Sequence, residues 1–289
     1  MVIDNINIID LGSSSVRICR ISNGKVLYKK SVVTRLAENK FNGYLDKCSM
    51  ERTAKAVKDF ADEASCLGGT TYIFATAAVR NATNGKEFAN YLQEITGTSV
   101  EILSGEQEAE IGILGALQGR DGGLIDIGGG SSEIIVAQSG KIEYEKSLQL
   151  GGVNLKDMAT SVANATSIAK EKVEFFGQVP SSRFYGVGGT ITSLTAILLG
   201  LKEYDSQKVH GYILTKNQLL RGASILSKYT AEQITQNYCV DIRRAEVLPY
   251  GVTILQAIFD KLNLDSIIVS ESDNLEGFAL KKKGVGYER

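Results

Sequence analysis

Two short glycine turns carry the residues of this 289-residue chain best suited to chemistry. DLGSSS begins at Asp10 and DIGGGSS begins at Asp126, and in each an acidic residue ends an apolar run two positions before a glycine. A turn without large side chains can aim successive backbone N–H groups into one concavity, which suits phosphate oxygens. The aspartates would then hold a divalent cation, because Mg²⁺ takes oxygen ligands beside substrate phosphates.

The alternative for each turn is an ordinary hairpin, in which glycine supplies φ > 0 and aspartate caps the backbone. Two matching turns 116 residues apart, each opening one half of the chain, favour phosphate binding over this alternative. No Gly-Lys-Ser/Thr follows either turn, which excludes the Walker A pattern. We expect a strand rather than a helix after the triple glycine, which excludes a Rossmann dinucleotide site.

A third glycine element, GVGGT, runs from a predicted strand into a predicted helix at residues 186–190. Gly188, Gly189 and Thr190 would present N–H groups at the positive end of the helix dipole, where a phosphate or the polar edge of a nucleotide binds. Thr190 as a plain helix N-cap explains the pattern equally well.

An acidic helix start follows at residues 104–112, SGEQEAEIG, where Ser104 and Gln107 have capping-box spacing. Glu106, Glu108 and Glu110 would stabilise the first turns of this helix through its dipole. A carboxylate here could instead activate water for attack on phosphorus. Arg80 is either a fork for phosphate oxygens or a solvated loop charge.

The elements that must position these residues alternate between strands and helices, which indicates an α/β fold. Both halves open with a strand, an Asp-x-Gly turn and a hairpin, and the polar segment 118–123 is the expected boundary between them. Between residues 190 and 262 we expect mostly helix. The predicted strands are 6–9, 16–21, 25–33, 71–75, 100–103, 124–127, 133–137, 141–148, 183–187 and 266–269, and the other helices are 50–67, 87–95, 104–117, 154–160, 167–176 and 275–282.

Composition excludes several classes of protein. A net charge of −1 argues against binding to DNA or to an anionic membrane. The four scattered cysteines show no metal-ligand or disulfide pattern, and the single histidine, His210, excludes Ser-His-Asp triads and multi-histidine metal sites. No signal peptide and no long apolar run is present, so we expect a cytoplasmic protein.

The motifs of this chain, and their order along it, resemble those of the exopolyphosphatase and guanosine pentaphosphate phosphatase family (Ppx/GppA). The resemblance rests on DLGSSSVRI, ATAAVRNATN, ILSGEQEAE, IDIGGGSSEI, LQLGGVNL, GVGGT, VHGYILT and RRAEVLPYGVTIL. It implies a two-domain, actin-like (ribonuclease H-like) α/β fold with the active site in an interdomain cleft. The expected domains are residues 1–120 and 121–274, with a helix in 275–289 returning to the first.

The resemblance also implies roles for individual residues. Glu108 matches the general base, and Asp126 and Glu133 match residues near the metal and the attacking water. Asp10 matches a metal or phosphate contact, and Mg²⁺, with Mn²⁺ as the alternative, is the implied cofactor. The expected phosphate-binding residues are Gly12, Ser13, Ser14, Arg80, Gly128, Gly129, Gly130, Ser131, Gly188, Gly189 and Thr190.

The implied reaction is attack by water on a terminal phosphoryl group of inorganic polyphosphate or guanosine pentaphosphate, in a homodimer. Ser14, Asn154 and Glu246 depart from residues usual in the family, which are asparagine, arginine and aspartate. Two alternatives stay open: a kinase of the same superfamily, and a non-catalytic sensor of phosphate compounds.

Overall fold

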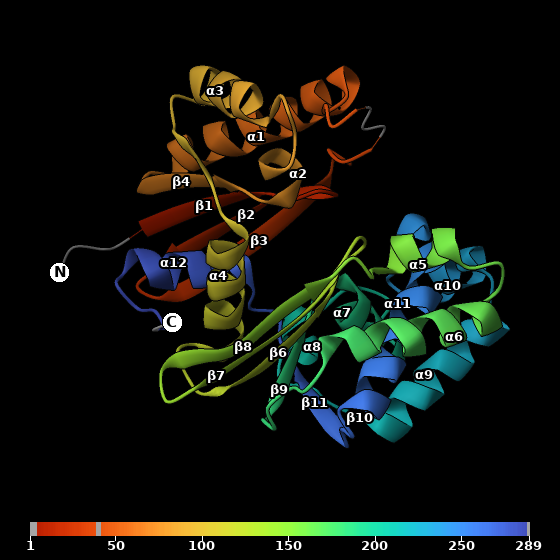
Figure 1. Ribbon diagram of the computed structural model, residues 1–289. Helices are drawn as coiled ribbons and strands as arrows, with labels where there is room; N and C mark the ends of the chain where they lie inside the picture. Colours follow the sequence, from red (N-terminus) through yellow and green to blue (C-terminus); the bar gives the residue numbers. More distant parts are fainter. Residues whose placement is uncertain (1–4, 39–41, 288–289) are drawn as a thin grey trace. The chain divides into compact units, whose positions relative to one another are not determined.

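The computed structural model describes residues 5–38 and 42–287 and divides the chain into two compact units (Figure 1). Unit 1 comprises residues 1–115 and 274–285, and unit 2 comprises residues 116–273 and 286–289. The division falls inside helix α4 (Gly105–Leu117), not in the polar segment 118–123 that we expected. The last two residues of α4 belong to unit 2, and Leu117 packs against Gly122 at the start of the next strand.

Unit 1 is built on a five-stranded mixed sheet in the order β3-β2-β1-β4-β5. β1 pairs antiparallel with β2 and parallel with β4. The elements are β1 (Asn5–Leu11), β2 (Ser15–Ser22), β3 (Lys25–Val33), β4 (Thr70–Ala75), β5 (Val100–Ile102), α1 (Lys47–Leu67), α2 (Ala77–Arg80), α3 (Gly85–Thr96), α4 and α12 (Asn274–Lys282).

β1 is buried on both faces because helices cover both of them. Ile9 and Leu11 belong to a core shared with α1 and α3, whereas Ile6 and Ile8 belong to a second core shared with α12. Two polar residues of the strand, Asn7 and Asp10, are buried as well, and each is hydrogen-bonded to an arginine. Helix α12 thus covers one face of the unit 1 sheet, although it comes last along the chain.

Unit 2 repeats this arrangement around a six-stranded sheet, in the order β10-β11-β9-β6-β7-β8. Its strands are β6 (Gly122–Ile127), β7 (Ser132–Gln138), β8 (Lys141–Leu148), β9 (Phe184–Val187), β10 (Ile213–Thr215) and β11 (Ser266–Val269). Its helices are α5 (Gly152–Met158), α6 (Val162–Val173), the 3₁₀ turn η1 (Glu174–Phe176), α7 (Gly189–Leu198), α8 (Ser206–Val209), α9 (Lys216–Lys228), α10 (Ala231–Asn237) and α11 (Ile242–Lys261).

The two sheets share one topology. In each, the third, second and first strands form an antiparallel meander, and the first strand pairs in parallel with a later one. Matching hairpin turns join the second and third strands, with φ of 51° and 78° at Asn23-Gly24 and 53° and 75° at Ser139-Gly140. The predicted α/β fold of ribonuclease H-like type is therefore confirmed, and the cleft between the domains stays a prediction.

The sequence-based assignment missed two short elements. The stretch expected to be mostly helical contains β10, three residues paired antiparallel with β11. The segment after β4, for which no element was predicted, forms the single-turn helix α2. A run of three or four residues shows no hydrophobic period, so only tertiary pairing reveals it.

Close backbone packing of α12 on α4 yields the first prediction. A Cβ on Gly277 would lie within 3.0 Å of the carbonyl of Ile111, so the helices would have to move apart. We expect Gly277→Ala to lower the free energy of unfolding by about 1–3 kcal/mol through overpacking. Denaturant unfolding measures this effect. Gly105→Ala is the control, since a Cβ there meets open space, and an equal loss in both variants would contradict the packing of α12 described above.

Candidate active site

Each of the two predicted phosphate turns is closed by a backbone hydrogen bond of the same kind. The Gly12 N–H donates to the Ser15 carbonyl at 3.0 Å, and the Gly128 N–H donates to the Ser131 carbonyl at 3.0 Å. Each turn lies between two antiparallel strands, β1 and β2 in unit 1 and β6 and β7 in unit 2. The similarity seen in the sequence is thus a similarity of conformation as well.

The turn of unit 1 is held from one side through its carbonyl groups. The Ser13 carbonyl accepts the N–H of Ala37 at 3.0 Å, and the Ser14 carbonyl accepts the N–H groups of Thr34 and Arg35 at 3.0 and 2.9 Å. In a trans peptide the C=O and the following N–H point in opposite directions. The N–H groups of Ser14 and Ser15 therefore point away from the segment that holds the turn.

The turn of unit 2 is held in the same manner by the start of α5. The Gly128 carbonyl accepts the N–H of Gly152 at 3.0 Å, and the Gly129 carbonyl accepts those of Val153 and Asn154 at 2.8 and 3.2 Å. The Asn154 side-chain amide donates to the Gly130 carbonyl at 2.6 Å.

Three successive carbonyls of this turn thus face α5, so the N–H groups of Gly129, Gly130 and Ser131 face the opposite side. Gly129 and Gly130 are themselves exposed. A row of N–H groups of this kind is the backbone arrangement that binds anions.

The acidic residues that precede the two turns have different partners. Asp10 is 2% exposed and accepts the Arg17 Nε–H at 3.0 Å. Asp126 pairs across the strands with Glu133, the residue that occupies the position of Arg17 in the second turn. Directly opposed residues of antiparallel strands project on one face with Cβ atoms about 5 Å apart. One turn therefore carries an ion pair, and the other carries two neighbouring carboxylates.

Glu108 and Arg80 meet within unit 1. The Arg80 Nη1 donates to Glu108 Oε2 at 2.7 Å and to the Leu103 carbonyl at 2.8 Å. Both side chains are about one quarter exposed, at 26% and 27%. The predicted capping box is confirmed, since Ser104 and Gln107 exchange bonds of 2.9 and 3.1 Å at the start of α4. Arg80 is thus not a solvated loop charge but holds the carboxylate of Glu108.

The third glycine element lies beside the second turn. Gly188 has φ 88° and ψ 162°, a backbone conformation open almost only to glycine. A Cβ at Gly188 would also lie within 3.0 Å of Asp126 Oδ1. The interpretation of Thr190 as an N-cap is wrong: Gly188 is the N-cap residue, and the Thr190 side chain packs over Gly251 of α11.

Two residues beside α7 were missed by the sequence analysis as site candidates. The guanidinium of Arg244 lies against Gly189, and its Nη1 donates to Ser193 Oγ at 3.4 Å. Tyr204 contacts the Glu271 carboxylate, and this negative charge raises the pKa of Tyr204. The motif RRAEVLPYG contains Arg244, but only the fold brings it to the helix start.

A divalent metal fits unit 2 better than unit 1. No group of three or more His, Cys, Asp or Glu residues suited to a metal exists among the described residues. Mg²⁺ nevertheless binds through one or two carboxylates, water and substrate phosphates, and Asp126 and Glu133 supply such a pair. Asp10, which we expected as a metal ligand, is engaged by the Arg17 guanidinium and is less suited to that role.

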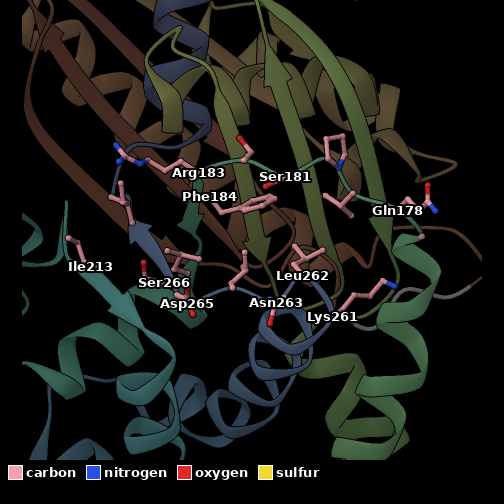
Figure 2. A pocket seen from close by; sticks show the side chains of 17 residues that line it. Gln178, Ser181, Arg183, Phe184, Ile213, Lys261, Leu262, Asn263, Asp265 and Ser266 are labelled. Atoms are coloured by element: carbon pink, nitrogen blue, oxygen red, sulfur yellow. The ribbon is translucent and has the colours of Figure 1, made fainter.

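A separate cavity of about 940 Å³ lies at the end of the unit 2 sheet where β9 and β11 begin, opposite the end that carries the glycine turns (Figure 2). Phe184, where β9 begins, and Ser266, where β11 begins, line it, whereas the glycine turns follow the ends of β6 and β9. None of the predicted site residues is among the described residues that line this cavity. It is therefore not part of the candidate site.

Comparison with known proteins assigns the chain to a family. Residues 17–283 match the model of the Ppx/GppA phosphatase family. The chain belongs to this family. Among the helices of the described residues, none is long and apolar enough to cross a membrane.

Several curated relatives of this chain are longer than it is. A bifunctional 3-dehydroquinate synthase/phosphatase of Fusobacterium nucleatum is 29% identical over 94% of this chain and 46% of its own length. A guanosine-5'-triphosphate,3'-diphosphate pyrophosphatase of Photobacterium profundum is 30% identical over 97% of this chain and 58% of its own length. The chain thus spans about half the length of these two curated relatives.

Two comparisons cover both partners almost completely. Exopolyphosphatase 2 of Mycobacterium tuberculosis is 24% identical over 98% of this chain and 100% of its own. The crystal structure of the Aquifex aeolicus member of the Ppx/GppA family is 28% identical and superposes with a TM-score of 0.85 over 97% of this chain and 98% of that one. The two-unit fold is therefore that of a Ppx/GppA protein.

The position of Gly188 yields the second prediction. We expect Gly188→Ala to lower the free energy of unfolding by about 1–3 kcal/mol from backbone strain and by a similar further amount from the clash with Asp126. Gly68→Ala is the control, because Gly68 has similar angles, φ 65° and ψ 176°, with nothing near its Cβ position. Denaturant unfolding of the two variants separates the effects, and equal losses would argue against the contact with Asp126.

Proposed function

We propose that this chain is a metal-dependent phosphohydrolase that removes terminal phosphate from inorganic polyphosphate, guanosine pentaphosphate or both. The observation that carries the proposal is the pair of glycine turns held by their carbonyls, which leaves their N–H groups for phosphate oxygens. Family membership and the names of the relatives, an exopolyphosphatase and pyrophosphatases of a guanosine phosphate, support it.

Binding of the phosphate chain would use backbone and guanidinium donors. The N–H groups of residues 129–131 and those that begin α7 carry partial positive charge, and anions bind at such helix starts. Arg244 adds a fixed positive charge beside Gly189. Because an Arg fork makes two parallel bonds to a phosphate, this residue would orient the chain as well as attract it.

Glu108 is the proposed general base. Water attacks the terminal phosphorus, a new P–O bond forms while the bridging P–O bond breaks, and the water proton passes to the Glu108 carboxylate. The leaving phosphate chain carries away the bridging oxygen and its electron pair. Arg80 holds Glu108 Oε2 and the Leu103 carbonyl together, so the carboxylate is kept in one orientation before substrate arrives.

Asp126 and Glu133 are the proposed holders of a divalent cation, Mg²⁺ or Mn²⁺. When bound, the cation would neutralise charge on the phosphate oxygens and polarise the phosphoryl group. Because Gly188 has no Cβ, the start of α7 packs directly against Asp126 Oδ1, and any side chain at this position would displace the carboxylate.

The role of Glu108 is tested by Glu108→Gln. The amide keeps the shape of the side chain but cannot accept a proton, so we expect kcat to fall roughly 10²- to 10⁴-fold, the usual contribution of a general base. The substrates are tripolyphosphate, long-chain polyphosphate and guanosine pentaphosphate, and the measurement is released phosphate.

Glu106→Gln is the matched control, because Glu106 lies in the same helical turn and carries the same charge. Wild-type turnover that persists in Glu108→Gln would remove the proposed base. Binding of these compounds without any turnover by the wild-type protein would instead favour a sensor.

The metal assignment is tested by Asp126→Asn. Removing one of two carboxylates should raise the Mg²⁺ concentration for half-maximal activity at least about tenfold, which corresponds to ~1.4 kcal/mol of lost binding. Chelation should abolish phosphate release, and added Mg²⁺ should restore it. Asp121→Asn is the control for the change in charge, because Asp121 is an exposed residue directly before β6 whose carboxylate accepts the Ser139 N–H at the β7–β8 turn. Equal Mg²⁺ dependence in both variants would contradict the role of Asp126.

A further inference from the structure

We infer that residues 147–154, SLQLGGVN, form a positioning segment whose two ends set two different parts of the proposed site. Ser147 at one end orients Glu133, and Asn154 at the other end orients the phosphate turn. The inference rests on the proposed function and assigns a role to the motif LQLGGVNL, for which the sequence indicated none.

Ser147 lies in a row of three residues across three strands. Asp126 of β6 is opposite Glu133 of β7, and Glu133 is opposite Ser147 of β8. Their side chains therefore share one face of the sheet. The Ser147 hydroxyl donates to Glu133 Oε1 at 2.7 Å, which restricts the carboxylate to one orientation beside Asp126.

The middle of the segment packs against the glycine turn itself. The buried Ser132 hydroxyl donates to the Leu150 carbonyl. A Cβ on Gly151 would lie within 3.0 Å of the backbone of both Gly129 and Gly130, so the two chains touch backbone to backbone. Only glycine permits this approach, and the turn thus rests on a rigid surface.

Asn154 completes the support at the far end. Its backbone N–H donates to the Gly129 carbonyl, and its side-chain amide donates to the Gly130 carbonyl at 2.6 Å. The amide fixes the peptide between Gly130 and Ser131, and with it the direction of the Ser131 N–H. Neither Ser147 nor Asn154 needs to touch substrate, so both are positioning residues rather than catalytic ones.

The two ends should give different kinetic signatures. Outer partners of a metal ligand typically contribute roughly 10- to 100-fold to activity. We expect Ser147→Ala to lower kcat by roughly that factor while leaving the Kd for inorganic phosphate within about twofold, a change worth under ~0.5 kcal/mol. Ser147→Thr keeps the hydroxyl and should retain most of the activity.

Asn154→Asp should show the opposite pattern. The carboxylate cannot donate to the Gly130 carbonyl and repels it, so the turn loses its fixed N–H direction. We expect the Kd for inorganic phosphate and the KM for tripolyphosphate to rise about tenfold, an effect of ~1.4 kcal/mol, with a smaller change in kcat. Asn164→Asp is the control, because Asn164 is an exposed residue of α6 that accepts the Thr160 N–H, and an aspartate there keeps that bond.

Calorimetric titration with inorganic phosphate and steady-state kinetics with tripolyphosphate measure these quantities, with thermal unfolding recorded for each variant. The inference is overturned if Ser147→Thr loses as much kcat as Ser147→Ala, or if Asn154→Asp binds phosphate as the wild-type protein does. If the wild-type protein hydrolysed no substrate, the proposed function would fail, yet the phosphate titration would still decide the role of Asn154.

Discussion

The candidate site depends on one constraint, the hydrogen bonding of turn carbonyls on the side away from the ligand. Left in solvent, a glycine turn samples many conformations, and its N–H groups would have to be ordered when phosphate binds. Here the Ser13 and Ser14 carbonyls are held by residues 34–37, and the carbonyls of residues 128–130 are held by α5. Because each peptide is planar, fixing the C=O also fixes the following N–H. The ordering cost is thus met on folding rather than on binding.

The repeated architecture explains why the two turns match, and their chemistry explains why they are not interchangeable. Both sheets place an Asp-x-Gly turn after the central strand and a second strand that returns antiparallel to it. Seven residues beyond the aspartate, however, one unit has Arg17 and the other has Glu133. Arg17 neutralises Asp10, whereas Glu133 adds a second negative charge beside Asp126. The second turn therefore carries the pair of carboxylates that suits the proposed cation, and the first turn carries no such pair.

The sequence predicted the fold further than it predicted the site. The strand meanders, the hairpin turns at Asn23 and Ser139 and the start of α4 follow from local patterns, because turn chemistry and hydrophobic period act over a few residues. The Asp10–Arg17 ion pair, the contact between Arg80 and Glu108, and the placement of Arg244 over Gly189 join residues whose partners only the fold determines. The N-cap alternative for Thr190 was wrong for the same reason, since its contact Gly251 lies 61 positions away in the sequence.

Glycines connect the candidate site of unit 2 to its core. Gly188 leaves room for Asp126, Gly189 leaves room for Arg244, and Gly251 leaves room for Thr190. These three contacts place the start of α7 directly against a site carboxylate, a guanidinium and the long helix α11. Because no space is left in these packed contacts, a side chain added at any one of the three glycines must displace its neighbours. These contacts therefore couple the start of α7 to the Asp126 carboxylate and to α11. A site built in this way is as rigid as the core of unit 2.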